Sequence, residues 1–343
     1  MKVTRLPAVL AACLLAACLS YAPVTTRAVA APCEFDNVER IVAVGDVHGA
    51  YDQLLKILEI AGVVDAQGRW AGGRTHFVQT GDVFDRGPDS LKATEFLRKL
   101  TREAERAGGR VHALLGNHET MRLLGIYRDA VPAEFEAFRT AGSADLRERL
   151  ASQVDPATRA KIMAEPLGTI EMVEAFRPQG SLGSYLRTLN TTVRINGIVF
   201  VHGGLTPDLA KMTCAQINDA VRREMGRDFE KTQRALEKSL SAGEFGPLWY
   251  RGLALEPEAF QPQVDAILAA QNARAIVVGH SIVPGKITSR FGGKVYTIDT
   301  GMQPAYVRDG AASALEIKGP TITAIYLDRR EVLAGGVAQE VIR

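Results

Sequence analysis

One pattern constrains the fold of this chain more than any other, and it occurs five times. A short apolar run stops at a glycine or at a His-Gly pair, and polar residues follow at once. Short apolar runs bounded by glycine predict buried strands. The five runs, each with the motif that follows it, are residues 41–44 before GDVHG, 77–78 before GDVFDRG, 111–115 before GNHE, 198–201 before HGG and 275–278 before GHS.

Helical segments separate these strands, at residues 51–61, 90–107 and 262–271. Strands that alternate with helices predict a layered α/β fold. In such folds ligands bind beyond the carboxyl ends of the strands. We therefore expect the five polar clusters to converge on one site, at one edge of one sheet.

Other stretches complete a single domain over residues 34–343. Residues 120–188 are mostly helix-forming and charged, with several proline and glycine breaks. They predict a helical insertion at about 120–190 that forms a lid beside the site. Residues 295–298 and 322–327 are rich in β-branched and apolar residues, and we expect them to be closing strands of a second sheet.

The side chains at the strand ends suit a transition metal. Imidazole and carboxylate together bind Mn, Fe and Zn, and four of the six histidines follow predicted strands. His76 and His112 instead begin apolar runs, so we expect them to pack in the core or face solvent. Any one cluster is ordinary turn chemistry, whereas five compatible clusters together indicate a site. Its candidate members are Asp46, His48, Asp82, Asn117, His118, His202 and His280.

Taken together, GDVHG, GDVFDRG, GNHE, VHGG and GHS resemble the signature of the calcineurin-like metallophosphoesterases. The DRG and the glutamate of GNHE resemble the phosphoprotein-phosphatase branch. The insertion, the N-terminal segment and WYRG are most similar to the bacterial Shewanella-like protein phosphatases. The resemblance covers residues from about 40 to 303. TIDTGMQPAY replaces the motif that eukaryotic serine/threonine phosphatases have after the last histidine, so their substrate preference does not transfer.

The resemblance implies a mixed β-sandwich flanked by helices, with two divalent metal ions. Asp46, His48 and Asp82 would hold the first ion, and Asp82 would bridge to the second. Asn117, His202 and His280 would complete the second. We expect manganese, with iron or zinc as alternatives. A hydroxide held between the two metals would attack phosphorus in line with the leaving oxygen.

The same resemblance assigns roles to the remaining polar residues. His118 would be the general acid, with Asp85 as its carboxylate partner. Arg86 would bind the phosphate oxygens through its guanidinium fork, and Arg251 in WYRG would be a second clamp. The leading hypothesis is a phosphomonoesterase acting on phosphoproteins or phosphopeptides, with phosphotyrosine preference as a further hypothesis.

Other functions remain open. A dinucleoside polyphosphate hydrolase could use the same scaffold, and GPDS at residues 87–90 is compatible with it. A non-catalytic phosphopeptide-binding envelope protein is a third hypothesis. A net charge of +2 without a dense Lys/Arg block gives no support for a nucleic-acid partner.

Residues 1–30 have the form of a signal peptide. A basic start precedes an apolar run at residues 6–19, which is too short to span a bilayer. The sequence ending at Cys18 resembles a lipobox, which would place a lipid anchor on that cysteine. Cleavage after Ala28-Val29-Ala30 is the alternative. Either ending predicts export to the bacterial periplasm or cell envelope.

Two cysteines lie beyond the predicted signal peptide, Cys33 and Cys214. In an oxidising compartment such a pair is a candidate disulfide. Two unrelated buried thiols are the alternative interpretation.

Overall fold

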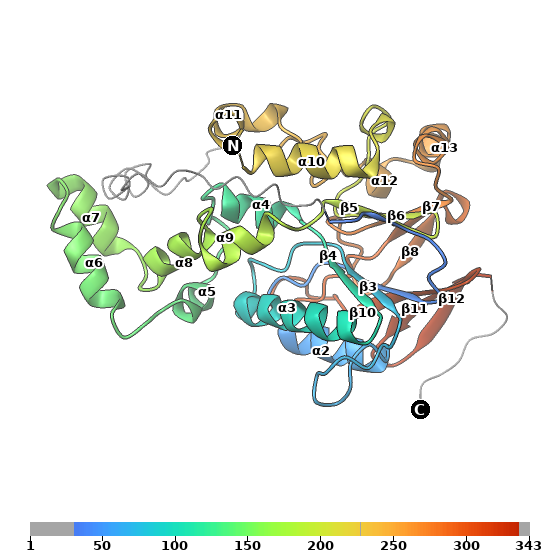
Figure 1. Ribbon diagram of the computed structural model, residues 1–343, viewed down its shortest axis with the longest axis horizontal. Helices are drawn as coiled ribbons and strands as arrows, with labels where there is room; N and C mark the ends of the chain where they lie inside the picture. The colour runs from blue at the N-terminus through green and yellow to red at the C-terminus, as the bar shows by residue number, and fades with distance from the viewer. Residues whose placement is uncertain (1–30, 227, 336–343) are drawn as a thin grey trace.

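A computed structural model describes residues 31–226 and 228–335. Two six-stranded sheets pack face to face in this part of the chain (Figure 1). One sheet contains, in order, β12 (Arg330–Ala334), β11 (Thr321–Tyr326), β10 (Ser313–Lys318), β2 (Ile41–Val44), β3 (His76–Gln79) and β4 (Arg110–Ala113). The other contains β1 (Glu34–Phe35), β5 (Thr192–Ile195), β6 (Ile198–Val201), β7 (Ala275–Val278), β9 (Val295–Thr297) and β8 (Thr288–Arg290).

Side-chain alternation along the strands explains why both faces of each sheet are buried. Ile41 and Ala43 of β2 face the space between the sheets, where they join Phe200 of β6 in one apolar cluster. Val42 and Val44 point the other way, into the cluster beneath the helices. Successive residues of a strand point to opposite faces, so a continuous apolar run fills both layers of the core.

Helices cover the two outer faces (Figure 1). α2 (Tyr51–Ile60) and α3 (Ser90–Arg106) pack against the sheet that contains β2. On the other side lie α10 (Cys214–Glu224) and α13 (Gln261–Ala270). Each presents apolar residues at helical spacing, as in Val264, Ile267 and Leu268 of α13. The predicted α/β sandwich flanked by helices is confirmed.

The expectation of a single sheet edge was wrong. β2, β3 and β4 run parallel in one sheet, whereas β6 and β7 run parallel in the other. The two predicted closing strands also separate, because β9 pairs with β7 while β11 pairs with β10. Alternation determines which faces a strand buries but not which strand lies beside it. The five strand ends still meet, because the two stacked sheets end at the same side of the sandwich.

A run of helices joins β4 to β5. These are α4 (Asn117–Leu123), α5 (Pro132–Ala137), α6 (Ser143–Ala151), α7 (Pro156–Ala164), α8 (Thr169–Phe176) and α9 (Ser181–Leu186). α6 and α7 lie far from the sheets in Figure 1 and share a small core of their own around Ala151 and Ile162. The other short helices are η2 (Leu209–Lys211), α11 (Phe229–Arg234), η3 (Leu236–Lys238), α12 (Gly252–Leu255), η4 (Glu258–Phe260) and η5 (Phe291–Gly293).

The predicted signal peptide at residues 1–30, including Cys18, lies outside the described residues. Within the described residues, no helix has both the length and the apolar character needed to cross a bilayer.

Candidate functional site

A cavity of about 430 Å³ opens where the strands end. Ten residues were predicted for the site, and the structure gathers all of them at or just behind this cavity. His202 is fully buried beside Asp82, and Asp85 is fully buried behind His118. The other eight line the cavity directly: Asp46, His48, Asp82, Arg86, Asn117, His118, Arg251 and His280.

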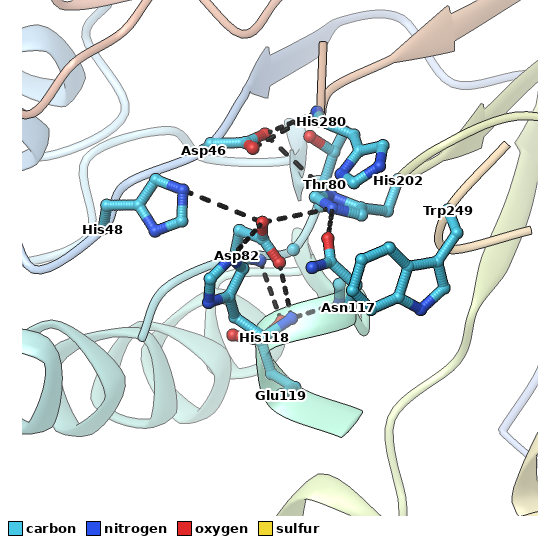
Figure 2. A network of polar contacts seen from close by, with 12 residues as sticks. Asp46, His48, Thr80, Asp82, Asn117, His118, Glu119, His202, Trp249 and His280 are labelled. Carbon is cyan, nitrogen blue, oxygen red and sulfur yellow. Dashed lines mark hydrogen bonds and ion pairs between the residues drawn. The ribbon is translucent and has the colours of Figure 1, made fainter. Parts of the chain in front are cut away.

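Asp82 lies at the centre of the site (Figure 2). Its Oδ2 atom is 3.3 Å from His202 Nε2, 3.7 Å from His48 Nε2 and 3.8 Å from His118 Nε2. Its Oδ1 atom accepts a hydrogen bond from the His118 backbone N–H at 3.0 Å. One carboxylate therefore faces imidazoles that come from both sheets.

Two of these imidazoles are oriented by backbone carbonyls. His48 Nδ1 donates to Phe84 O at 2.9 Å, and His202 Nδ1 donates to Thr80 O at 3.0 Å. With the proton on Nδ1, each Nε2 presents a lone pair toward Asp82. Such a bond to the outer ring nitrogen is typical of metal-ligating histidines. His202 Nε2 also lies 2.8 Å from Asn117 Oδ1, so an amide oxygen joins the same donor set.

Asp46 and His280 meet beside His202, whose Nδ1 lies 4.0 Å from Asp46 Oδ1 and whose ring centroid lies 4.9 Å from that of His280. The backbone N–H of His280 donates to both Asp46 oxygens, at 3.0 and 3.2 Å. The buried His280 Nε2 has no hydrogen-bond partner in the described residues. Two glycines make the close approach feasible. A Cβ at Gly279 would collide with the Asp46 carboxylate, and one at Gly116 would collide with that of Asp82.

Burial determines the charge state of most of these groups. It lowers the pKa of His48 to about 4 and that of His280 well below its usual value, so both imidazoles are neutral. Burial alone would raise the pKa of Asp82, but His202 and His118 outweigh it and hold that pKa well below its ordinary value. Burial and the facing carboxylates of Asp299 and Asp82 raise the pKa of Asp46.

Neutral imidazoles beside carboxylates fit divalent transition metals, which require deprotonated ligands. Two three-residue groups have ligand atoms within 4.8 Å of one another, and both include Asp82. One joins Asp82 to His202 and His280. The other joins it to His48 and His118. Of these, His118 fits a metal least well, because the Arg86 guanidinium lies 3.4 Å from its Nε2.

His118 begins a buried chain of charged groups. Its Nδ1 donates to Asp85 Oδ2 at 2.6 Å, and Asp85 Oδ1 lies 2.6 Å from the fully buried Arg122 guanidinium. Arg122 also contacts Glu134 of α5 at 3.2 Å. Burial alone would lower the pKa of His118, but the carboxylates of Asp82 and Asp85 outweigh it and raise that pKa.

Of the three arginines that line the cavity, Arg86 and Arg251 were predicted from the sequence. The Arg86 guanidinium stacks 3.9 Å above the Tyr306 ring, which fixes its plane beside His118. Arg251 lies on the exposed rim, where one nitrogen donates to His280 O at 2.7 Å and to Ser281 Oγ at 3.2 Å. Both can present their remaining N–H groups to an anion in the cavity.

The backbone is strained where the site is built. Of nine non-glycine residues with left-handed φ in the described chain, five belong to the predicted site, with φ between 47° and 72°. Such conformations cost free energy for residues with a Cβ and cluster at functional sites. The five are His48, Asp82, Asp85, Arg86 and His280.

Several residues at the site were not predicted. Glu119 accepts the backbone N–H groups of Asp82, Val83 and Gly116 at 2.7 to 2.8 Å, and so ties the ends of β3 and β4 together. Asp299 follows β9 and lines the cavity. Its signal was available, because TID repeats the pattern of a strand followed by an acid.

Of the insertion predicted as a lid, only the loop residue Arg128 lines the cavity, and the helices α5 to α9 do not. The residues that line the cavity come from the strand ends and from loops around Arg128, Trp249, Ile282 and Tyr306. The segment between β4 and β5 instead supports the site from behind, through the contacts of Glu134 with Arg122 and with the Asp85 N–H.

Cys33 and Cys214 lie together as buried free thiols. Cys214 Sγ donates to the backbone oxygen of Cys33 at 3.3 Å. The structure therefore places the pair in contact without a bond between the sulfurs, and the disulfide stays a prediction.

Comparisons with known proteins agree with this geometry. The model of a family described as calcineurin-like phosphoesterase matches residues 39–284. Shewanella-like protein phosphatase 2 of Arabidopsis thaliana is 31% identical over 311 residues, which cover 83% of this chain and 76% of that protein.

One solved structure and one partial relative complete the comparison. The crystal structure of a cold-active protein-tyrosine phosphatase from a psychrophilic Shewanella species superposes with a TM-score of 0.69 at 28% identity, covering 89% of this chain and 83% of that one. A symmetrical bis(5'-nucleosyl)-tetraphosphatase of Cronobacter sakazakii is 34% identical over only 84 residues, or 24% of each chain.

Proposed function

Because the chain belongs to the calcineurin-like phosphoesterase family and is thus a metallophosphoesterase, we propose that it is a protein phosphatase that prefers phosphotyrosine. One observation carries the proposal. A carboxylate shared by two groups of potential metal ligands lies beside a histidine–carboxylate pair and an arginine, all at one cavity. The relatives named as protein phosphatases point to phosphoproteins as the substrate class.

The metal ligands in this proposal are those that face the cavity centre. Asp46, His48 and Asp82 would hold one divalent ion, and Asp82 would also serve the second. Asn117, His202 and His280 would complete the second position. When bound, the two ions supply a nucleophile at neutral pH and neutralise charge on the phosphate oxygens.

His118 is the proton donor to the leaving oxygen. Asp85 holds its Nδ1–H at 2.6 Å, so Nε2 is the nitrogen that faces the cavity with a proton. The carboxylates of Asp82 and Asp85 raise the pKa of His118, which favours the protonated imidazole that a general acid requires. Arg122 holds the Asp85 carboxyl group in place at 2.6 Å, so the acid is oriented from behind.

Arg86 and Arg251 bind the phosphate oxygens. Arg86 approaches His118 Nε2 at 3.4 Å, so a phosphate bound to Arg86 has its leaving oxygen within reach of the acid. The Tyr306 ring fixes this guanidinium in one plane. A guanidinium in a fixed plane binds two phosphate oxygens as a fork.

Aromatic and apolar walls support the preference for phosphotyrosine. Tyr306 and Ile282, at 41% and 36% exposure, line the mouth of the cavity together with Trp249. A flat phenyl ring can pack against these surfaces, whereas the short phosphoserine side chain cannot reach them while its phosphate is bound. A second, more apolar cavity of about 550 Å³ shares Trp249 and Arg251 with the first and has room for neighbouring peptide residues.

The test is hydrolysis of matched phosphotyrosine, phosphoserine and phosphothreonine peptides by the purified protein with Mn²⁺. We expect the highest kcat/KM on the phosphotyrosine peptide. The proposal fails if none of the peptides is hydrolysed while two metal ions per chain are bound. Equal rates on all three would remove the phosphotyrosine preference but retain the phosphatase.

The partial similarity to a symmetrical bis(5'-nucleosyl)-tetraphosphatase favours hydrolysis of dinucleoside polyphosphates as a second candidate. That similarity spans a quarter of the chain, whereas similarity to the protein phosphatase spans most of it. Competition between diadenosine tetraphosphate and the phosphotyrosine peptide in one assay would decide between the two functions.

We also propose that the protein is exported to the periplasm or cell envelope and anchored through a lipid on Cys18. The motivation is the basic start, apolar run and lipobox-like residues of the N-terminus. Mass spectrometry of the mature N-terminus would show either the lipidated cysteine or a chain that begins near Ala31.

A further inference from the structure

Asp299 is a buried carboxylate that has no role in the proposed reaction so far. It follows β9, is 1% exposed and lines the same cavity as Asp46 and His280. β9 pairs in parallel with β7, so the residues that follow these two strands lie side by side. Asp299 thus occupies a sixth strand end at the site.

The backbone around Asp299 is tightly held. Its carbonyl oxygen accepts the Val283 N–H at 2.8 Å, and its Oδ1 accepts the Gly301 N–H at 3.1 Å. Gly45, which precedes Asp46, passes so close to the Ile298 carbonyl that a Cβ would not fit. This close approach brings the loop after β2 against the loop after β9, so Asp46 and Asp299 face each other.

No donor in the described residues lies between these two acids. Asp299 Oδ2 is buried without a hydrogen-bond partner. Its carboxyl group contacts that of Asp46, whose oxygens receive only the His280 N–H. The buried His280 Nε2 at the same cavity also lacks a partner. Two ionised carboxylates that face each other in a low-dielectric site repel, so this pair must either share a proton or hold a positive charge between them.

We propose that Asp299 supplies a further carboxylate oxygen to the metal-binding site, beside Asp46. This inference rests on the metal site of the proposed function. A second carboxylate at this position makes the donor set richer in oxygen and favours Mn²⁺ over softer ions. The Asp46 side of the site then differs in ligand type from the His202 side, where imidazole and amide groups dominate.

The test compares Mn²⁺ binding by the metal-stripped full chain and by Asp299→Asn, using isothermal titration calorimetry. We expect the variant to bind one of two Mn²⁺ ions roughly 10- to 100-fold more weakly. The melting temperature in EDTA should be unchanged or higher, because the substitution removes a repulsion. Glu316→Gln is the matched control, since Glu316 is a buried carboxylate paired with Arg40 outside the cavity.

Wild-type affinity at both sites in Asp299→Asn would overturn the inference. So would an equal loss of affinity in Glu316→Gln, because the effect would then be general destabilisation. If Asp299→Asn fails to fold in EDTA, the smaller Asp299→Ser takes the same test. Metal binding is measured without substrate, so an inactive protein that binds Mn²⁺ normally contradicts the proposed function and not the role of Asp299.

Discussion

The two ends of the central strands use the same residue type in opposite ways. At the carboxyl ends, His48, His118 and His202 all face Asp82 across the cavity. At the amino end of β3 and in β4, His112 Nε2 lies 3.1 Å from His76 Nδ1, and the two rings hydrogen-bond to each other. At the carboxyl ends the imidazole nitrogens face a cavity. At the other end the imidazole nitrogens of His76 and His112 form a hydrogen bond with each other.

The histidines at the two ends of the central strands differ in their surroundings and not in residue type. The Phe35 ring packs edge-on against His76 and His112, with centroids 5.2 and 4.9 Å away, and both histidines lie in regular strands. His48 and His280 instead have left-handed backbones at strand termini. A histidine with a strained backbone and carboxylate neighbours is typical of a functional site. A histidine in a regular strand, packed against an aromatic ring, is typical of a structural role.

The largest expected contrast is between His118→Asn and His112→Asn. The first removes the proposed proton donor and should lower kcat by roughly 10²- to 10⁴-fold while metal content stays at the wild-type level. The second changes a histidine of β4 that does not line the cavity, and should leave kcat within about twofold. Aryl phosphate kinetics with metal analysis of each protein would check both.

Loss of metal in His118→Asn would make His118 a ligand rather than the acid, in agreement with its place near Asp82. A matching loss of kcat in His112→Asn would remove the distinction between the two ends.

The next contrast concerns two arginines. Arg122→Met removes the ion-pair partner of the buried Glu134 and leaves Asp85 with His118 alone, and should destabilise the fold by about 3–5 kcal/mol. Arg110 lies over the Phe35 ring at 5.1 Å, and Arg110→Met should cost less than about 1 kcal/mol. Urea unfolding of both variants gives the two values. Equal losses would show that the Arg122 network contributes no more than a surface contact.

Much of the fold was predictable because the apolar runs end at glycines. β2, β6 and β7 begin and end at the predicted residues. β5 was not predicted, although Asn196-Gly197 offers a hairpin signal and both residues have left-handed φ. The pairing of strands into two sheets depends on contacts distant in sequence, which no local pattern contains.

The site divides in the same way. Those cavity-lining residues that directly follow strands, such as His48 and Asp82, could be predicted from local patterns. Arg122 and Glu134 belong to helices whose packing depends on tertiary structure, and nothing nearby in sequence links them to Asp85. Tyr306 reaches Arg86 across more than two hundred residues of chain, so its role was equally hidden.

Oxidation of Cys33 and Cys214 to a disulfide should raise the free energy of unfolding by linking two segments near the amino ends of the central strands. Cys33 precedes β1, which carries Phe35, and both sulfurs are buried in contact. A disulfide here should stabilise the protein by about 2–4 kcal/mol. Unfolding with and without reductant, with Cys214→Ser as control, would show the difference. Two reactive thiols in the unfolded, unreduced protein would contradict the bond.

Low pH should lower the free energy of unfolding through protonation of His112 in the unfolded chain. Burial lowers its pKa in the folded protein to about 3, below the usual 6.5 of the unfolded chain. Above pH 6.5 both states are neutral and the effect vanishes. As the pH falls below 6.5 the unfolded chain takes up the proton first, so stability is lost progressively down to about pH 3.

At pH 5 the loss due to His112 should be about 2 kcal/mol relative to pH 7.5. His112→Gln should remove that part of the pH dependence, as urea unfolding at the two pH values would show. An unchanged pH dependence in the variant would mean that His112 is protonated in the folded protein.

The smallest expected effect compares two arginine–aromatic pairs, one at each end. Arg86 lies 3.9 Å above Tyr306 at the cavity mouth, and Arg110 lies 5.1 Å above Phe35 at the opposite end. Tyr306→Leu removes an aromatic surface worth about 0.5–1.5 kcal/mol. It should therefore lower the phosphotyrosine-to-phosphoserine ratio of kcat/KM by about 2- to 10-fold. Phe35→Leu should leave that ratio unchanged and alter only stability. An equal fall in kcat/KM for both peptides in Tyr306→Leu would mean that the Tyr306 ring only positions Arg86. A misplaced guanidinium weakens binding of the phosphate group equally in phosphotyrosine and phosphoserine.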